Sequence, residues 1–85
     1  MDQFGTTLRR LRRTRLGKQL NLASNVGCSE AAISLWETGT RLPSASSLRR
    51  ITEQLQKSGA SVEELEELNV SYLSAVVSRV TAKVG

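Results

Sequence analysis

The chain has 85 residues, 39% of them hydrophobic and 24% charged, a composition typical of one small folded domain. It has no histidine and one cysteine, so Ser-His-Asp or Cys-His catalysis, an intrachain disulfide and a His- or Cys-built metal site are excluded. We therefore expect neither an enzyme nor a cofactor or metal. No apolar run is long enough for a membrane helix, and the start lacks a signal-peptide pattern, which predicts a cytoplasmic protein.

The net charge of +4 is unevenly distributed along the chain. Residues 1–50 contain nine lysines and arginines against three acidic residues, whereas residues 51–85 contain three against five. This asymmetry predicts that the first half meets a polyanion while the second half faces elsewhere. The arginines between Arg9 and Arg15 fit either phosphate contacts or a solvated helix surface, and the acidic run from Glu63 to Glu67 fits a solvated face or a partner contact.

Apolar spacing predicts the first two helices. The first covers about residues 5–15, and its apolar residues are Phe4, Leu8 and Leu11. Gly17 is suited to the end of that helix. A second helix is predicted from residue 18 or 19 to Val26, where Gly27 breaks it.

Serines indicate where the next helices begin. Ser29 is a good N-cap for a third helix over about residues 30–38. Ser44 can cap a fourth helix, in which Leu48, Ile51 and Leu55 have helical spacing. The sequence Ser-Val-Glu-Glu at residues 61–64 has the form of a capping box and predicts a fifth helix.

The end of the chain fits two kinds of secondary structure. Residues 70–84 are rich in valine and serine and are compatible with a strand. The three- and four-residue spacing of the apolar side chains favours a helix instead. Residues 69–71, Asn-Val-Ser, could interrupt that helix.

Residues 19–38 have the pattern of two helices joined by a glycine turn. Ala23 lies where the two helices would cross most closely, and Gly27 lies where the turn is expected to need a positive φ. The apolar residues expected between the helices are Leu22, Val26, Cys28, Ile33 and Trp36.

With Gln19, Leu22-Ala23, Gly27, Ser29, Ile33-Ser34, Trp36-Glu37, Gly39 and Pro43, the sequence resembles the phage repressor and Cro class, the xenobiotic-response-element (XRE) family of helix-turn-helix DNA-binding regulators. The resemblance covers about residues 4–55. It implies an all-α, lambda repressor-like domain of five helices, the second and third of which read DNA. Before the glutamine the family usually has a glycine and an apolar residue, whereas this chain has Gly17 and Lys18.

The resemblance also implies roles for individual residues. Four side chains of the third helix would face the major groove and read bases, namely Glu30, Ala31, Ser34 and Leu35. Six residues would contact DNA phosphates, namely Gln19, Lys18, Ser29, Thr38, Thr40 and Arg41, although Ser29 could cap the helix instead. Arg12 and Glu37 would form a structural ion pair.

Chemistry narrows the predicted base preference. Glu30 can only accept hydrogen bonds, which suits the amino group of cytosine or, less often, of adenine. Ala31 and Leu35 offer apolar contact to thymine methyl groups. None of the four groove-facing residues can make the bidentate arginine contact with guanine, so phosphate contacts and DNA shape are expected to contribute much of the binding.

The end of the chain has more apolar residues than the core-facing side of one helix can bury. The others would be exposed on a monomer, and large exposed apolar patches are rare, so we predict a homodimer. We expect residues 1–58 to bind DNA and residues 59–85 to form a helical dimerisation segment with contacts from Leu65, Leu68, Tyr72, Val76 and Val80. Such a dimer would bind an inverted-repeat operator, with its recognition helices about 34 Å apart. The predicted function is a transcriptional regulator, in the first place a repressor. The alternatives are an antitoxin or anti-activator with a protein partner, and a controller-type activator.

Overall fold

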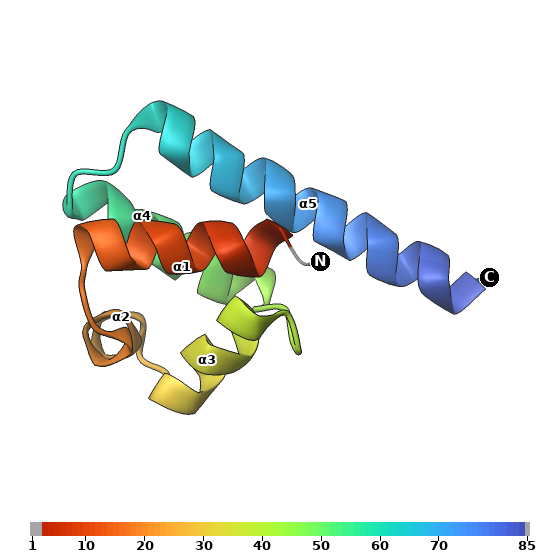
Figure 1. Ribbon diagram of the computed structural model, residues 1–85, viewed down its shortest axis with the longest axis horizontal. Coiled ribbons are helices and arrows are strands. Elements are labelled where there is room, and N and C mark those ends of the chain that lie inside the picture. Colours follow the sequence, from red (N-terminus) through yellow and green to blue (C-terminus); the bar gives the residue numbers. More distant parts are fainter. Residues whose placement is uncertain (1–2, 85) are drawn as a thin grey trace.

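Five helices make up residues 3–84, which are the residues that the computed structural model describes (Figure 1). They are α1 (Gln3–Arg15), α2 (Gln19–Val26), α3 (Glu30–Thr38), α4 (Ala45–Lys57) and α5 (Val62–Val84). Residues 3–84 contain no strand. Residues 1, 2 and 85, at the ends of the two predicted segments, lie outside the described residues, as do the side chains of residues 82–84.

Serine caps define the starts of α3 and α4, as predicted. The Ser29 hydroxyl oxygen accepts a hydrogen bond from the backbone N–H of Ala32 at 3.1 Å. The Ser44 hydroxyl oxygen accepts one from the backbone N–H of Ser47 at 3.2 Å. Each cap satisfies a first-turn donor that has no partner inside its helix.

The predicted capping box of α5 is present and is tied to α1. The backbone N–H of Ser61 donates to Glu64 Oε1 at 2.8 Å, and the Glu64 N–H donates back to Ser61 Oγ at 3.1 Å. Arg15 Nη2 lies 2.7 Å from the same Glu64 oxygen. The Ser61 backbone hydrogen bond, followed by that from Arg15, lowers the pKa of the Glu64 carboxyl from its usual value.

Helix α1 begins earlier than the sequence predicts, at Gln3 instead of residue 5. Gly5 lies inside it because α1 and α3 cross there at very short range. A Cβ atom on Gly5 would lie 2.4 Å from the backbone oxygen of Glu37 and 2.8 Å from that of Trp36. Glycine is therefore required by contact between two backbones, which the sequence pattern did not reveal.

The turn between α2 and α3 has the predicted backbone conformation. Gly27 has φ +82°, in the left-handed region, and its N–H donates to the carbonyl of Ala23. A side chain at this position would be strained. This turn directs α3 across α1 in the helix-turn-helix arrangement of Figure 1.

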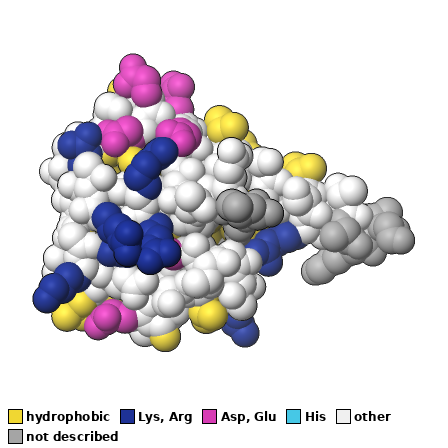
Figure 2. Space-filling model, viewed as in Figure 1, with side chains coloured by type: hydrophobic (Ala, Val, Ile, Leu, Met, Phe, Trp, Pro, Cys, Tyr) yellow, Lys and Arg dark blue, Asp and Glu magenta, His cyan; other side chains and the backbone are white. Residues whose placement is uncertain are grey.

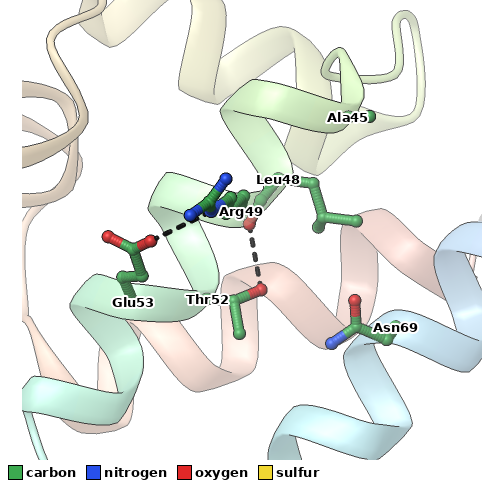
Figure 3. Close-up of a pocket in the computed structure, with 6 residues that line it drawn as sticks. All are labelled: Ala45, Leu48, Arg49, Thr52, Glu53 and Asn69. Carbon is green, nitrogen blue, oxygen red and sulfur yellow. Dashed lines mark hydrogen bonds and ion pairs between the residues drawn. The ribbon is translucent and has the colours of Figure 1, made fainter.

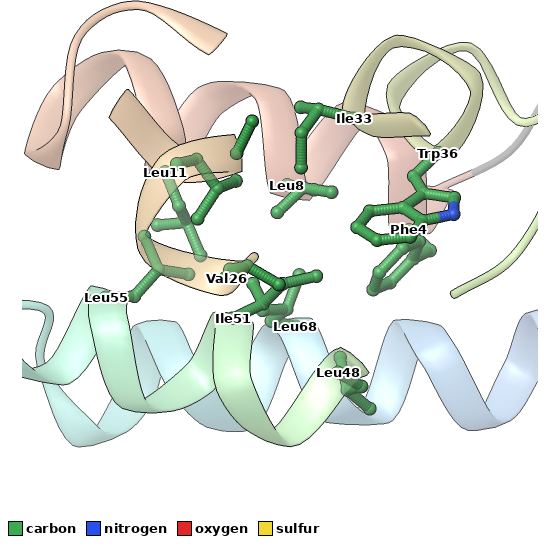
Figure 4. Close-up of a cluster of buried hydrophobic side chains, with 12 residues drawn as sticks. Phe4, Leu8, Leu11, Val26, Ile33, Trp36, Leu48, Ile51, Leu55 and Leu68 are labelled. Atoms are coloured by element: carbon green, nitrogen blue, oxygen red, sulfur yellow. The ribbon is translucent and has the colours of Figure 1, made fainter. Parts of the chain in front are cut away.

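One apolar core joins all five helices (Figure 4). Helix α1 is central and packs against α3 and α5 as well as α4, while α2 packs between α3 and α4. The buried apolar side chains are Phe4, Leu8, Leu11, Leu22, Ala23, Val26, Ile33, Trp36, Leu48, Ile51, Leu55 and Leu68. Every helix therefore supplies at least one residue to the same core.

Helix α5 runs without a break through residues 69–71. The Asn69 amide donates to the Leu65 carbonyl at 2.8 Å, and the Ser71 hydroxyl donates to the Leu68 carbonyl at 2.7 Å. These polar side chains bond within the helix, so the predicted interruption is wrong. The C-terminal part of α5 projects beyond the other helices (Figure 1). The whole is an all-α, lambda repressor-like fold, as predicted.

Candidate nucleic-acid interface

A buried ion pair fixes α3 to α1. Arg12 Nε lies 2.5 Å from Glu37 Oε2, and Arg12 Nη2 lies 3.0 Å from Glu37 Oε1. The two side chains are only 7% and 3% exposed. The planar guanidinium thus contacts both carboxylate oxygens, which fixes the relative orientation of the Arg12 and Glu37 side chains. The two residues named from sequence as a structural ion pair are in contact.

The same pair also anchors the start of α2. Gln19 Nε2 donates to Glu37 Oε1 at 3.1 Å, and Arg12 Nη1 donates to the carbonyl of Gly17. Gln19 was predicted from the resemblance to bind phosphate, and the structure places its amide against the glutamate. A glutamine amide has two N–H donors, so one remains for another acceptor. Together these contacts hold α1, α2 and α3 as one unit.

Three of the predicted base-reading residues, Ala31, Ser34 and Leu35, lie at helical spacing on one face of α3, whereas Ile33, Trp36 and Glu37 are buried on the other. Ala31 is exposed, and Ser34 and Leu35 are partly buried. The fourth, Glu30, lies seven residues before Glu37 and is exposed in the first turn of the helix.

The predicted phosphate contacts flank that face. Lys18, Thr38, Thr40 and Arg41 are exposed, and the hydroxyl oxygens of Thr38 and Thr40 are 3.0 Å apart. Ser29 is exposed too, but its hydroxyl oxygen caps α3, one of the two roles considered for it.

Helix α2 differs from α3 and α4 at its N-terminus. Lys18 occupies the N-cap position, and its side chain makes no capping hydrogen bond. The first-turn N–H groups of α2 therefore lack the side-chain acceptor that serine supplies to α3 and α4. The N–H of Asn21 donates to the Lys18 carbonyl at 3.0 Å, and the partial positive charge of the helix end favours an anion there.

Charge is segregated on the surface (Figure 2). Basic side chains lie over α1, and acidic side chains gather where α5 begins. Two ion pairs link these regions, Arg10 with Glu67 and Arg15 with Glu64, each at 2.7 Å. Part of the basic excess of α1 is thus compensated by α5, so these two arginines have a structural partner within the chain.

The five residues predicted to form the dimer contact have different surroundings. Leu68 is 0% exposed and lies in the core, and Leu65 and Tyr72 pack against it. The Tyr72 hydroxyl donates to the Pro43 carbonyl at 2.8 Å, so its outer edge is also engaged. Val76 is partly buried, and Val80 is 58% exposed. Of the five, Val80 is the one with most of its surface free.

A hollow lies between α4 and α5, away from α3 (Figure 3). It has a volume of about 270 Å³ and is lined by Ala45, Leu48, Arg49, Thr52, Glu53 and Asn69. Pockets that enclose small molecules usually measure about 300–1,000 Å³. Among the described residues there is no cluster of three or more acidic or cysteine side chains placed to bind a metal, and no helix has the length and hydropathy of a membrane span.

Comparison with known proteins agrees with this geometry. The family model of the helix-turn-helix domain matches residues 3–68, which include α1 to α4 and the first part of α5. No curated protein and no solved structure shows significant similarity to the chain. The matched region contains α2, α3 and the buried network that holds them to α1. The chain belongs to the helix-turn-helix domain family.

Proposed function

We propose that this protein is a sequence-specific DNA-binding transcriptional regulator of the phage repressor and Cro type, with α3 as its recognition helix. The observation that carries the proposal is the contrast between the two sides of α3. The inner side is fixed to α1 by the buried contact of Arg12 with Glu37. The outer side carries Ala31, Ser34 and Leu35, and both Ala31 and Glu30 of the first turn are exposed. A helix that is fixed to the body and has an exposed outer face is what major-groove reading requires.

In this proposal the outer face of α3 reads bases weakly. Glu30 accepts from a cytosine or adenine amino group, Ala31 and Leu35 contact thymine methyls, and Ser34 adds a small polar contact. Glu30 also occupies the first turn of α3, where a carboxylate interacts favourably with the helix dipole. Its effect on base choice must therefore be separated from its effect on stability.

Phosphate contacts supply most of the proposed affinity. Lys18, the uncapped start of α2 and the second amide N–H of Gln19 lie at one end of the reading unit. Thr38, Thr40 and Arg41 follow or end α3, which the contact of Gln19 with Glu37 holds near the start of α2. Phosphate contacts from these residues would fix the register of α3 on the duplex.

We further propose that the protein acts as a homodimer on an inverted repeat, with residues 19–38 for reading and residues 59–85 for pairing. Repression then needs only occupancy of a promoter. The start of α5 has two functions in this scheme, because Leu68 completes the core while the outer face remains available.

The proposal is tested by selecting binding sites from random DNA and measuring affinity for the selected duplex as salt is raised. Since a dimer would engage several phosphates in each half-site, affinity should fall by about 10³-fold or more between 50 and 200 mM salt. Absence of enrichment, or an affinity that does not change with salt, would refute the proposal.

A matched pair of lysines sharpens this test. Lys18→Gln should weaken binding to all duplexes alike and reduce the slope of log affinity against log salt by about one for each subunit. Lys57→Gln removes the same charge at the end of α4, on the other side of α1 from α2 and α3 in Figure 1. That control should leave the slope unchanged. Equal effects of the two changes would argue for attraction by net charge alone.

A further inference from the structure

Helix α5 carries a second apolar face, which the described residues of the chain leave exposed. Val70, Leu73, Val77 and Val80 are between 58% and 66% exposed. Their spacings of three, four and three residues place them on one stripe, on the opposite side of the helix from the buried Leu68. Apolar side chains line this edge of α5 in Figure 2.

The spacing of the stripe suits another helix. Alternation of three and four residues is the repeat of a coiled-coil seam, in which each side chain packs between residues of a facing helix. The stripe lies largely on the part of α5 that projects beyond the body, so a second helix can approach it without obstruction (Figure 1).

We propose that α5 pairs antiparallel with α5 of a second copy, so that Val70 packs near the partner subunit's Val80 and Leu73 near the partner subunit's Val77. This inference rests on the proposed dimeric regulator and adds the face, the register and the direction of pairing. All four exposed side chains of the stripe are covered in this register. The pairing is centred near residue 75.

Charge decides between the two possible directions. Continued toward the N-terminus with the same spacing, the stripe reaches Glu66 and Glu63, which are exposed. A parallel pair would place each of these carboxylates beside its own counterpart, an unfavourable like-charge contact. An antiparallel pair in this register places Glu66 opposite the end of the partner helix and Glu63 beyond that end, and residues 70–85 contain no acidic residue.

The antiparallel direction also gives a suitable separation of the two bodies. From residue 75 to Leu68 and Leu65 there are seven and ten residues, or about 10 and 15 Å of helix at 1.5 Å per residue. The two cores then lie on opposite sides of the centre, about 20–30 Å apart along the helix direction. Because the helices are also displaced sideways, this approaches the roughly 34 Å between successive major grooves. A parallel pair would place both bodies at the same end.

Two side chains of α5 that are not part of the stripe connect this helix to the end of α3 and the loop that follows it. Arg79 Nη2 donates to the carbonyl of Gly39, the C-cap residue of α3, at 2.8 Å. The Tyr72 hydroxyl donates to the Pro43 carbonyl four residues further along the chain. The direction of α5 is thereby fixed relative to the recognition helix, so the geometry of pairing sets the geometry of the two recognition helices.

Disulfide trapping tests the direction. Cys28 is the one cysteine of the chain and is partly buried, with a thiol pKa raised by burial, so Cys28→Ala gives a background without thiols. In that background, full-length V70C mixed with V80C should form a cross-linked heterodimer under mild oxidation. Neither protein alone should cross-link efficiently, because ten residues, or about 15 Å, separate like positions. Efficient cross-linking of V70C with itself and V80C with itself would show a parallel pair and overturn the proposal.

Measurements of the oligomeric state test whether the exposed stripe of α5 is the face that pairs. Val77→Glu should raise the dimer dissociation constant by at least about 30-fold, because a carboxylate would lose its hydration in an apolar seam. The matched control is Val62→Glu, on the same helix and 68% exposed, but beyond the paired residues. Equal weakening by both changes, or a wild-type protein that is monomeric both free and on DNA, would overturn the inference. Salt-dependent binding of such a monomer to a single half-site would still support the proposed function.

Discussion

Helices α3 and α5 each place the same residue type in two opposite environments. In α3, Glu37 is buried in an ion pair while Glu30 is exposed. In α5, Leu68 is fully buried while Leu73 is 63% exposed. The covered member of each pair maintains the fold, and the uncovered member is available to DNA or to a second copy. Residue type alone therefore does not determine which of these two roles a side chain has. Its position relative to α1 determines the role.

The largest expected effect concerns the two glutamates. Glu37→Gln should lower the free energy of unfolding by about 3–5 kcal/mol, because the Arg12 guanidinium would remain buried without its counter-charge. Glu30→Gln should change it by no more than about 1 kcal/mol, since only a helix-dipole interaction is weakened. Urea unfolding of the two variants measures both. Similar stabilities would contradict the role given to the buried pair.

Leu68 and Leu73 of α5 should differ in their contribution to the unfolding free energy nearly as much as the two glutamates do. Leu68→Ala removes a fully buried side chain and should cost about 2–5 kcal/mol of unfolding free energy. Leu73→Ala should cost less than about 0.5 kcal/mol in dilute protein, where pairing is absent, and should weaken dimerisation instead. Unfolding and sedimentation of both variants give the comparison. A Leu73→Ala variant that unfolds as easily as Leu68→Ala would mean that the outer face belongs to the core.

A smaller effect on the unfolding free energy is expected at Tyr72, which lies between the buried and the exposed faces of α5. Tyr72→Phe removes the hydrogen bond to the Pro43 carbonyl but keeps the edge-on contact with Phe4, whose ring centre is 5.5 Å away. The change should cost about 0.5–1.5 kcal/mol of unfolding free energy. Thermal unfolding checks this value. An unchanged melting temperature would show that the hydroxyl contributes nothing to holding α5.

The smallest effect is a pH dependence at the start of α5. The folded state lowers the pKa of Glu64, so ionised Glu64 stabilises the fold at neutral pH, and that contribution is lost as pH falls through the lowered pKa. The stability difference between wild type and Glu64→Gln should therefore shrink on acidification. Glu63→Gln, at the exposed neighbour, is the control and should give a small difference throughout. A difference for Glu64→Gln that persists at low pH would exclude the ionised carboxylate as its cause.

The candidate site could be predicted from sequence only in part. Helix α3 was predictable because Ser29, Gly27 and the apolar spacing of Ile33 and Trp36 act within a few residues of one another. The contact of Gln19 with Glu37 and that of Arg79 with Gly39 were not predicted. These partners are 18 and 40 residues apart and leave no periodic signal in the chain.

The sequence by itself determined the five helices and most of their ends, because caps, turn glycines and apolar spacing are local physical signals. Only the tertiary structure decided which side of α5 faces α1. Both sides have helical apolar spacing, and the choice depends on how Leu68 and Tyr72 fit beside Phe4. It also showed why Gly5 must be small, since two backbones meet there. Contacts between distant segments depend on the packed geometry of the whole chain, which no local pattern encodes.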